Sequence, residues 1–398
     1  MSIPELAQKL DAVNTADEEE RKLLLQACDR LKSRLETPFD FTARLSFSGH
    51  QAMAIRLAVD LKLFDTIARL STQSQDGFFT TDQLSESTDA EPLLVTRIIS
   101  FLAAMGVVQE IDRGTYVQTK LAASYVSSSP LSAGIIHSTH FLTVLSRLPE
   151  YFHEKGWQSP GDAWDGPFQY ALGTNAHYFD FLSSHPYYQQ AFNTVMAMSF
   201  RRHGRDWFEL FPVEERLRVQ NDTDPLIVDV GGSQGKDLKM FKERFPHLPG
   251  KLILQDLPSV TANAQSLPPG IEVQGHDFFH EQPVRNARAY LMRTVLHDWP
   301  DKQAVQILGR LRAAMNRDSR LLISEYMRPE SNVSFSSGLA DIHMMTSFAS
   351  LERTQQQWKT LLETAGFELI QVWLPDGCDA ASESLAEQAA LLEARVKE

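Results

Sequence analysis

A glycine-rich turn directly follows a hydrophobic run at residues 226–230, in the segment LIVDVGGSQG. Glycine has no side chain, so a buried strand that ends in such a turn lets the backbone approach a nucleotide closely. Residues 236–244 can form the helix that follows. We therefore expect Gly231 and Gly232 to contact a bound ligand that carries a nucleoside.

Other nucleotide sites also use a glycine-rich turn, and two of them fit this sequence poorly. A phosphate-binding P-loop needs Lys followed by Ser or Thr after its last glycine, whereas this chain has Lys236 and Asp237. A dinucleotide site that starts at Gly231 needs glycine where Ser233 and Lys236 stand. An adenosine site for a methyl donor is the interpretation that is left.

Acidic residues follow the next two predicted strands. Asp256 lies 25 residues after Gly231, at a strand end where a carboxylate can accept hydrogen bonds from ribose hydroxyls. Asp277 and Phe278 follow the third strand, where a carboxylate and an aromatic ring could hold the adenine amino group and ring face. Three consecutive strand ends therefore describe one adenosine site.

A histidine follows the fourth predicted strand. His297, in the segment RTVLHDWPD, lies just past residues 289–292 and should face the ligand crevice at the carboxyl end of the sheet. Histidine titrates near neutral pH and often acts as a general base, so it could take a proton from a hydroxyl. The neighbouring Asp298 could have a purely structural role, as the cap of the helix that begins near Pro300.

Together, the ordered motifs VDVGGSQG, LQDLP, HDFF, RTVLHDWPD, LLISEYMRP and LERTQQQWKTLLETAGF resemble those of the plant caffeic-acid-type and fungal natural-product O-methyltransferases. The resemblance spans about residues 43–373. It implies a class I methyltransferase fold with S-adenosylmethionine as cosubstrate. The residues that it implies for holding this methyl donor are Gly231, Gly232, Asp256, Asp277, Phe278 and Arg293.

The same resemblance implies that His297 is the general base and that Glu325 and Glu352 are the acids beside it. A phenol with a pKa of about 10 and a free histidine at about 6.5 differ by about 3.5 units, so full proton transfer would cost roughly 5 kcal/mol. A carboxylate that orients the ring and stabilises the imidazolium reduces that cost. No metal is expected, because the base and the cationic donor supply what a bound Mg²⁺ would. The expected reaction is methylation of a hydroxyl on a small aromatic or polyketide-like secondary metabolite.

Two other functions fit the same fold. Some fungal relatives bind the sulfonium but catalyse dehydration or pericyclic ring closure without methyl transfer, and their histidine is typically altered. Retention of His297 favours the methyltransferase, while His137 and His140, near the expected pocket, keep the alternative open. A catalytically inactive winged-helix regulator would need a broken donor site or a basic helix, and neither is present. Candidate walls of the acceptor pocket are Phe141, Tyr151, Met344, Met345 and Phe348.

The elements that must position these residues alternate between strand-like and helix-like runs, which predicts a doubly wound, Rossmann-like α/β sheet over residues 221–375. Residues 131–220 are helical and rich in aromatic side chains, and we expect them to link the domains and line the substrate pocket. Residues 376–398 are expected to be a helical tail, with a polar helix from Ala380 onward. The expected strands are residues 226–230, 252–255, 271–273, 289–292, 321–324 and 367–373.

Residues 1–130 are expected to form a helical, winged-helix dimerisation domain, with two helices followed by a hairpin at Asp112-Arg113-Gly114. The second helix, EPLLVTRIISFLAAM, carries one arginine and a broad apolar surface, so it lacks the basic face of a DNA reader. Residues 53–64 are more apolar than a solvent-facing helix needs to be. With the resemblance, this predicts a homodimer in which each copy contributes residues to its partner's pocket.

Bulk composition narrows the environment and the partners. Hydrophobic residues make up 43% of the 398 residues, and no apolar run approaches the roughly 18 residues of a membrane span, so we expect no membrane partner. The acidic start of the chain is unlike a signal peptide, which predicts a cytoplasmic protein. Two cysteines support neither a disulfide framework nor a thiolate metal site. A net charge of -13 disfavours a nucleic acid partner, so the expected ligands are small molecules.

Overall fold

The computed structural model describes residues 2–13, 15, 17–198, 206–262, 267–375 and 389–397. The chain divides into two compact units, residues 1–127 and residues 128–398, which are described separately below. Among the described residues, no helix is long and apolar enough to cross a membrane.

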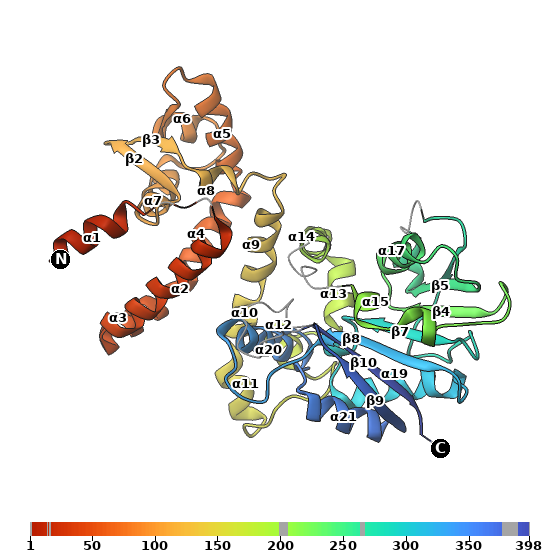
Figure 1. Ribbon diagram of the computed structural model, residues 1–398. Coiled ribbons are helices and arrows are strands. Elements are labelled where there is room, and N and C mark those ends of the chain that lie inside the picture. The colour runs from red at the N-terminus through yellow and green to blue at the C-terminus, as the bar shows by residue number, and fades with distance from the viewer. Residues whose placement is uncertain are drawn as a thin grey trace. The chain divides into compact units, whose positions relative to one another are not determined.

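The first unit is mostly helical (Figure 1) and contains a small antiparallel sheet of order β1-β3-β2. Its buried core includes Leu63, Phe64, Phe79, Ile99 and Leu102. Two short helices followed by a hairpin match the predicted winged helix. The elements are α1 (Ile3–Asp11), α2 (Glu18–Leu35), α3 (Pro38–Ser46), α4 (Ser48–Asp60), α5 (Leu63–Gln73), β1 (Phe78–Thr80), α6 (Thr81–Glu86), α7 (Pro92–Ala104), β2 (Val108–Asp112), β3 (Thr115–Gln118) and α8 (Lys120–Ala123).

The second unit starts with the aromatic-rich helical region that the sequence predicted. Proline at the first turn begins many of these helices, where the missing N–H costs nothing. The helices are α9 (Pro130–His140), α10 (Leu142–Leu145), α11 (Leu148–Glu154), α12 (Pro167–Leu172), α13 (Tyr178–Ser184), α14 (Pro186–Ala197), α15 (Trp207–Leu210) and α16 (Val213–Arg216).

A mixed sheet of order β6-β5-β4-β7-β8-β10-β9 carries the rest of the second unit (Figure 1). The strands β6, β5, β4, β7 and β8 are parallel, and β10 runs antiparallel to both β8 and β9. All six strands expected from the sequence are present. They are β4 (Pro225–Val230), β5 (Lys251–Asp256), β6 (Ile271–Gly275), β7 (Ala289–Arg293), β8 (Arg320–Tyr326) and β9 (Phe367–Trp373).

Apolar residues cover both faces of this sheet, as a parallel sheet between helices requires. On β7, Tyr290 and Met292 pack into one cluster, while Ala289 and Leu291 pack into the other. The order of the strands reverses at β4, which has β5 on one side and β7 on the other. Ligands bind at such a switch point, beyond the carboxyl ends of the strands. The remaining elements are α17 (Lys236–Arg244), α18 (Pro258–Thr261), the 3-10 turn η2 (Leu296–Asp298), α19 (Asp301–Ala314), α20 (Phe335–Phe348) and α21 (Gln355–Thr364).

The C-terminal tail corrects one expectation. We expected a polar helix from Ala380 onward, but the described end of the chain forms strand β10 (Ala389–Val396), and residues 376–388 lie outside the described residues. The tail contains good helix formers, but packing between β8 and β9 buries most of β10 and overrides that local preference. The buried carboxylate of Glu393 there accepts hydrogen bonds from Arg216 at 2.9 Å and forms an ion pair with Arg320 at 3.3 Å.

Candidate active site

The glycine turn after β4 has the close approach that the sequence predicted. Gly231 has a φ of +77°, and a Cβ added to it would lie 2.8 Å from Val295 and 3.8 Å from the Phe278 ring. A Cβ on Gly232 would lie 2.5 Å from a carboxylate oxygen of Asp229. Both glycines therefore allow the chain to pass where a side chain would collide, and Phe278 lies beside the turn.

Ser233 and Asp256 are joined at this turn. Ser233 has a φ of +55°, a conformation that glycine adopts more easily, and its N–H donates a hydrogen bond to Asp256 Oδ2 at 2.8 Å. The N–H of Leu257 donates to Asp256 Oδ1, also at 2.8 Å. Burial raises the pKa of Asp256, and these two donors oppose that effect. Each carboxylate oxygen keeps a further lone pair that can accept a ribose hydroxyl.

Asp277 and Phe278 follow β6, as expected. Asp277 Oδ1 accepts a hydrogen bond from the N–H of Phe279 at 2.9 Å, which shapes the turn. The Phe278 ring meets the Trp299 ring edge to face, with centroids 5.8 Å apart. A carboxylate, an aromatic face and a glycine turn that excludes side chains fit an adenosine ligand in character, which makes these residues candidates for holding S-adenosylmethionine.

Arg293 has a neighbour that the sequence reasoning missed. Its guanidinium forms an ion pair with Asp237 in the first turn of α17, the helix that follows the glycine turn. Both side chains are largely buried. An acid in the first turn of a helix was the available signal, because it complements the helix dipole. Arg293 thus holds the first turn of α17, the helix that follows the glycine turn.

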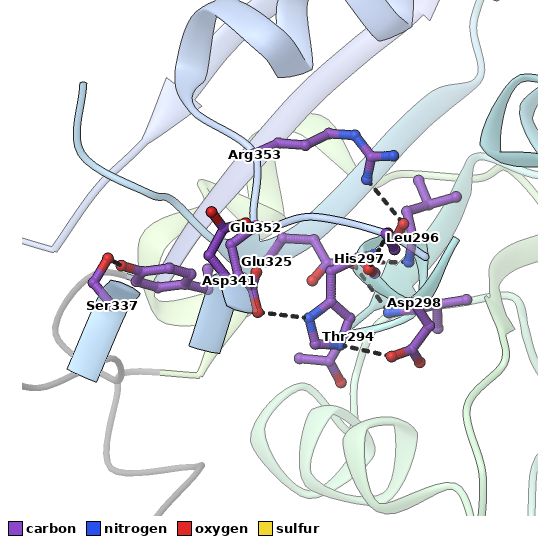
Figure 2. Close-up of polar contacts among 12 residues, drawn as sticks. Thr294, Leu296, His297, Asp298, Glu325, Ser337, Asp341, Glu352 and Arg353 are labelled. Carbon is purple, nitrogen blue, oxygen red and sulfur yellow. Dashed lines mark hydrogen bonds and ion pairs between the residues drawn. The ribbon is translucent and has the colours of Figure 1, made fainter. Parts of the chain in front are cut away.

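His297 lies in the η2 turn after β7, with a carboxylate at each ring nitrogen (Figure 2). Its Nδ1 atom is 3.2 Å from Glu352 Oε1, so Nδ1–H can donate to that carboxylate. Its Nε2 atom is 3.5 Å from Asp298 Oδ1. Burial alone would lower the pKa of His297, but Asp298, Glu325 and Glu352 together raise it to about 10.

The second predicted acid does not bond to the ring. Glu325 Oε1 accepts hydrogen bonds from three consecutive backbone N–H groups, those of Val295 at 3.0 Å, Leu296 at 2.9 Å and His297 at 3.3 Å. Burial raises the pKa of Glu325 to about 7, against the opposing charge of His297. Glu325 therefore holds the turn that carries the histidine, and Glu352 orients the imidazole.

Two further residues, which the sequence reasoning missed, donate hydrogen bonds to carbonyl oxygens of the same turn. The buried guanidinium of Arg353 donates hydrogen bonds to the carbonyl oxygens of Leu296 at 2.9 Å and Trp299 at 2.7 Å. Ser350 Oγ donates to the carbonyl oxygen of His297 at 2.6 Å. Arg353 directly follows Glu352 in the LERT motif. One segment therefore supplies both the carboxylate that contacts the His297 ring and the guanidinium that holds the turn.

The residues expected to line the acceptor pocket do not all pack together. Phe141, Met344 and Phe348 share one buried cluster with Phe168 and Tyr178, while Met345 is half-buried. Tyr151 packs elsewhere, against Phe152 and Tyr170. His137 and His140 both lie against the Phe141 ring, each with a centroid separation of 5.4 Å. The structure thus brings the α9 histidines and the α20 residues together and leaves Tyr151 apart.

Comparisons with known proteins identify the family of each part of the chain. The profile of the O-methyltransferase domain matches residues 152–368, and that of the O-methyltransferase dimerisation domain matches residues 43–128. O-methyltransferase mfmE of Annulohypoxylon moriforme is 34% identical to this chain and aligns over 94% of the chain and 92% of its own length. Demethylsterigmatocystin 6-O-methyltransferase of Aspergillus flavus is 33% identical, with coverage of 86% and 87%.

A solved structure described as a pericyclic reaction enzyme also shares the fold, with a TM-score of 0.79 and 29% identity over 99% of this chain and 98% of that one. The matched domain covers more than half of the chain and contains the glycine turn, His297 and Glu352. The chain therefore belongs to the S-adenosylmethionine-dependent O-methyltransferase family.

Proposed function

We propose that this protein transfers the methyl group of S-adenosylmethionine to a hydroxyl of a small aromatic or polyketide-like secondary metabolite, with His297 as the general base. The observation that carries the proposal is the pairing of His297 Nδ1 with Glu352 Oε1 at 3.2 Å, on a turn beside the adenosine-type site. The similarity to demethylsterigmatocystin 6-O-methyltransferase supports this class of acceptor.

The proposed base has two distinct ring nitrogens. Nδ1 faces Glu352, so Nε2 is the atom that would accept the proton of the acceptor hydroxyl. The carboxylate of Asp298 lies 3.5 Å from Nε2, on the side where the acceptor must approach. Asp298 can therefore stabilise the imidazolium that forms and also compete with the hydroxyl for Nε2.

The charges around His297 reduce the mismatch between histidine and phenol. The three carboxylates raise the pKa of His297 to about 10, which is close to that of a phenol. Proton transfer between groups of similar pKa costs little free energy. When bound, S-adenosylmethionine supplies a methyl group on a cationic sulfur, and a cation near His297 lowers the pKa of the imidazole and favours its neutral, proton-accepting form.

Residues of the chain would hold the donor on the glycine side of the crevice. Asp256 has acceptor capacity for ribose hydroxyls, and Asp277 with Phe278 offers a carboxylate and a ring face for the adenine. Arg293 would act through Asp237, by fixing the first turn of α17.

The test is a screen of phenolic and enolic acceptors with S-adenosylmethionine carrying an isotopically labelled methyl group, analysed by mass spectrometry. A labelled product that appears in equal amounts with S-adenosylhomocysteine is expected. The His297→Gln protein should bind the donor but form product at least about a hundredfold more slowly.

A second function has a specific observation in its favour, the structural similarity to a pericyclic reaction enzyme. In that case the bound sulfonium acts only as an electrostatic catalyst of dehydration or ring closure. The same screen distinguishes the two functions, because conversion of the substrate without S-adenosylhomocysteine would favour the second one. The carboxylate-flanked His297 favours methyl transfer.

A further inference from the structure

Gln255, near the end of β5, is bonded to two segments of the chain that are proposed to hold the donor. Its backbone carbonyl oxygen accepts hydrogen bonds from the N–H groups of Gly231 at 2.8 Å and Gly232 at 3.1 Å. Its side-chain amide bonds to the β6–β7 loop, residues 276–288, which carries the proposed adenine contacts. The residue is fully buried. One residue therefore connects the glycine turn with the proposed adenine-binding loop.

The contact with this loop is a reciprocal pair of amides. Gln255 Nε2 donates to Gln282 Oε1 at 2.8 Å, and Gln282 Nε2 donates to Gln255 Oε1 at 2.8 Å. Gln255 Nε2 also donates to Gln274 Oε1 at 2.8 Å, and Gln282 Oε1 also accepts the N–H of Val284 at 3.0 Å. Gln282 is only 3% exposed. Because buried amides need hydrogen-bond partners, each glutamine of this amide pair fixes the position of the other.

The amide pair holds one end of the segment that carries residues 277–278, and a backbone hydrogen bond holds the other end. The N–H of His276 donates to the carbonyl oxygen of Asp256 at 2.8 Å. Gln282 lies four residues after position 278 and bonds to Gln255. Both contacts are made to adjacent residues of β5, so this segment is held against the strand that ends in Asp256.

Stability alone does not explain two buried glutamines at this place. The preceding residues of β5, Leu252, Ile253 and Leu254, are apolar and buried. Replacing two hydrogen-bonded groups by apolar groups of the same shape can be nearly neutral for stability. An apolar pair would not fix the distance and direction of the loop, whereas a fully bonded polar pair does. The amide pair therefore supplies geometry.

We propose that Gln255 and Gln282 are positioning residues for the methyl donor, which set the adenine contacts of residues 277–278 relative to the carboxylate of Asp256. This inference rests on the proposed function, because it assigns the nucleoside of S-adenosylmethionine to these two contacts. A nucleoside must reach both contacts at once, and a misplacement of about 1 Å is enough to weaken such a site strongly. Neither glutamine has to touch the donor.

Donor titrations of three variants test this role. Gln255→Met, Gln282→Met and the double variant are titrated with S-adenosylmethionine by calorimetry, at a temperature where circular dichroism shows that each is folded. Each single variant should bind at least about tenfold more weakly, because either substitution breaks the same amide pair. The double variant should bind within about twofold of the weaker single variant, because the second substitution has no pair left to break.

Gln282→Asn gives a second way to break the pair. It keeps an amide, but its side chain is one methylene shorter and cannot maintain both bonds to Gln255. It should show the same loss of donor affinity, so the test stands even if a methionine variant does not fold.

Gln169→Met is the matched control for an effect on stability alone. Gln169 is also buried, and its amide makes hydrogen bonds of 3.0 Å to the N–H of Gly166 and to the carbonyl oxygens of Ala163 and Ala176. This substitution should lower the unfolding temperature but keep donor affinity within about twofold of the wild type.

A shorter ligand locates the effect on the donor. 5′-Methylthioadenosine contains the nucleoside of S-adenosylmethionine but not its amino-acid part. Each variant of the amide pair should lose the same factor of affinity for this ligand as for S-adenosylmethionine, because the pair acts on the nucleoside contacts.

Several results would overturn the positioning role while the wild type still binds the donor. They are unchanged donor affinity in the amide-pair variants, losses that multiply in the double variant, an equal loss in Gln169→Met, and a loss that is absent for 5′-methylthioadenosine. A wild type that does not bind S-adenosylmethionine would refute the proposed donor site itself, and the positioning role with it.

Discussion

The guanidinium of Arg353 donates a hydrogen bond to the carbonyl oxygen of Leu296 at 2.9 Å, directly before the proposed base in the chain. The same side chain reaches the carbonyl oxygen of Trp299 and the carboxylate of Asp301, and it is fully buried. It also stacks over the Trp358 ring, 5.0 Å from the ring centroid. One buried cation thus fixes both ends of the turn that carries His297.

Arg353→Met should therefore destabilise the protein and displace the base. The carbonyl oxygens of Leu296 and Trp299 would lose their charged donor, which should cost about 2 to 4 kcal/mol of unfolding free energy. Denaturant unfolding measures this loss. Arg317→Met, at a side chain that is 87% exposed, is the control and should change stability by less than about 0.5 kcal/mol. Equal stability of the two variants would mean that Arg353 does not hold the turn.

Asp256→Ala should weaken binding of S-adenosylmethionine at least about tenfold, a factor that equals 1.4 kcal/mol. The substitution removes the proposed acceptor for ribose hydroxyls and also the acceptor of the Ser233 N–H. Calorimetric titration with the donor measures the affinity. Glu272→Gln, at an exposed residue of β6, is the control. Unchanged affinity in Asp256→Ala would remove this residue from the donor site.

The pH dependence of kcat/KM should report the carboxylates around His297. Only the neutral imidazole accepts a proton, and the neighbouring acids raise the pKa of His297 to about 10, so activity should rise with pH across the neutral range. Asp298→Asn removes one of these charges and should move the rising limb to lower pH. Asp318→Asn, at an exposed position, should not move it. A shift to higher pH in Asp298→Asn would contradict the proposed role of the carboxylate.

Much of the fold could be predicted from the sequence because each buried strand ends in a distinctive group, such as Gly231 after β4 or Asp256 at the end of β5. The strand β10 could not be predicted. Its residues are good helix formers, and only its insertion between β8 and β9 makes a strand. Glu393 illustrates the difficulty, since its partners Arg216 and Arg320 are 177 and 73 residues away in sequence.

The site residues could be predicted by type, but only some of their partners could. His297 and Glu352 meet as expected, whereas Glu325 bonds to backbone N–H groups instead of the ring. The difference arises because the register of β8 beside β7 brings Glu325 under the start of η2. Arg293 likewise forms an ion pair with Asp237 that the sequence did not predict, because this contact depends on how α17 packs after the glycine turn.

His297→Gln should separate binding from chemistry. Glutamine cannot act as a general base, so turnover should fall by on the order of 10² to 10⁴. Calorimetry should show donor affinity within about threefold of the wild type, because none of the proposed donor-binding residues is removed. Near-normal methylation of the true acceptor by this variant would mean that the acceptor is already ionised or that another base serves.

Glu325 and Glu352 should respond differently to the same pair of substitutions. Glu325→Gln keeps an amide oxygen that can still accept the three N–H bonds at residues 295–297, whereas Glu325→Ala leaves those donors without their acceptor. The alanine variant should lose about 2 kcal/mol or more of stability, and the glutamine variant less.

Glu352→Gln keeps an acceptor for Nδ1–H but removes the charge that stabilises the imidazolium, so the fold should persist while the rising limb of the pH profile moves to lower pH. Glu352→Ala should also lose orientation of the ring and turn over more slowly than Glu352→Gln. Thermal unfolding and pH profiles on the four variants separate the two roles. Identical responses of the Glu325 and Glu352 pairs would contradict the division between an acid that holds the turn and an acid that orients the base.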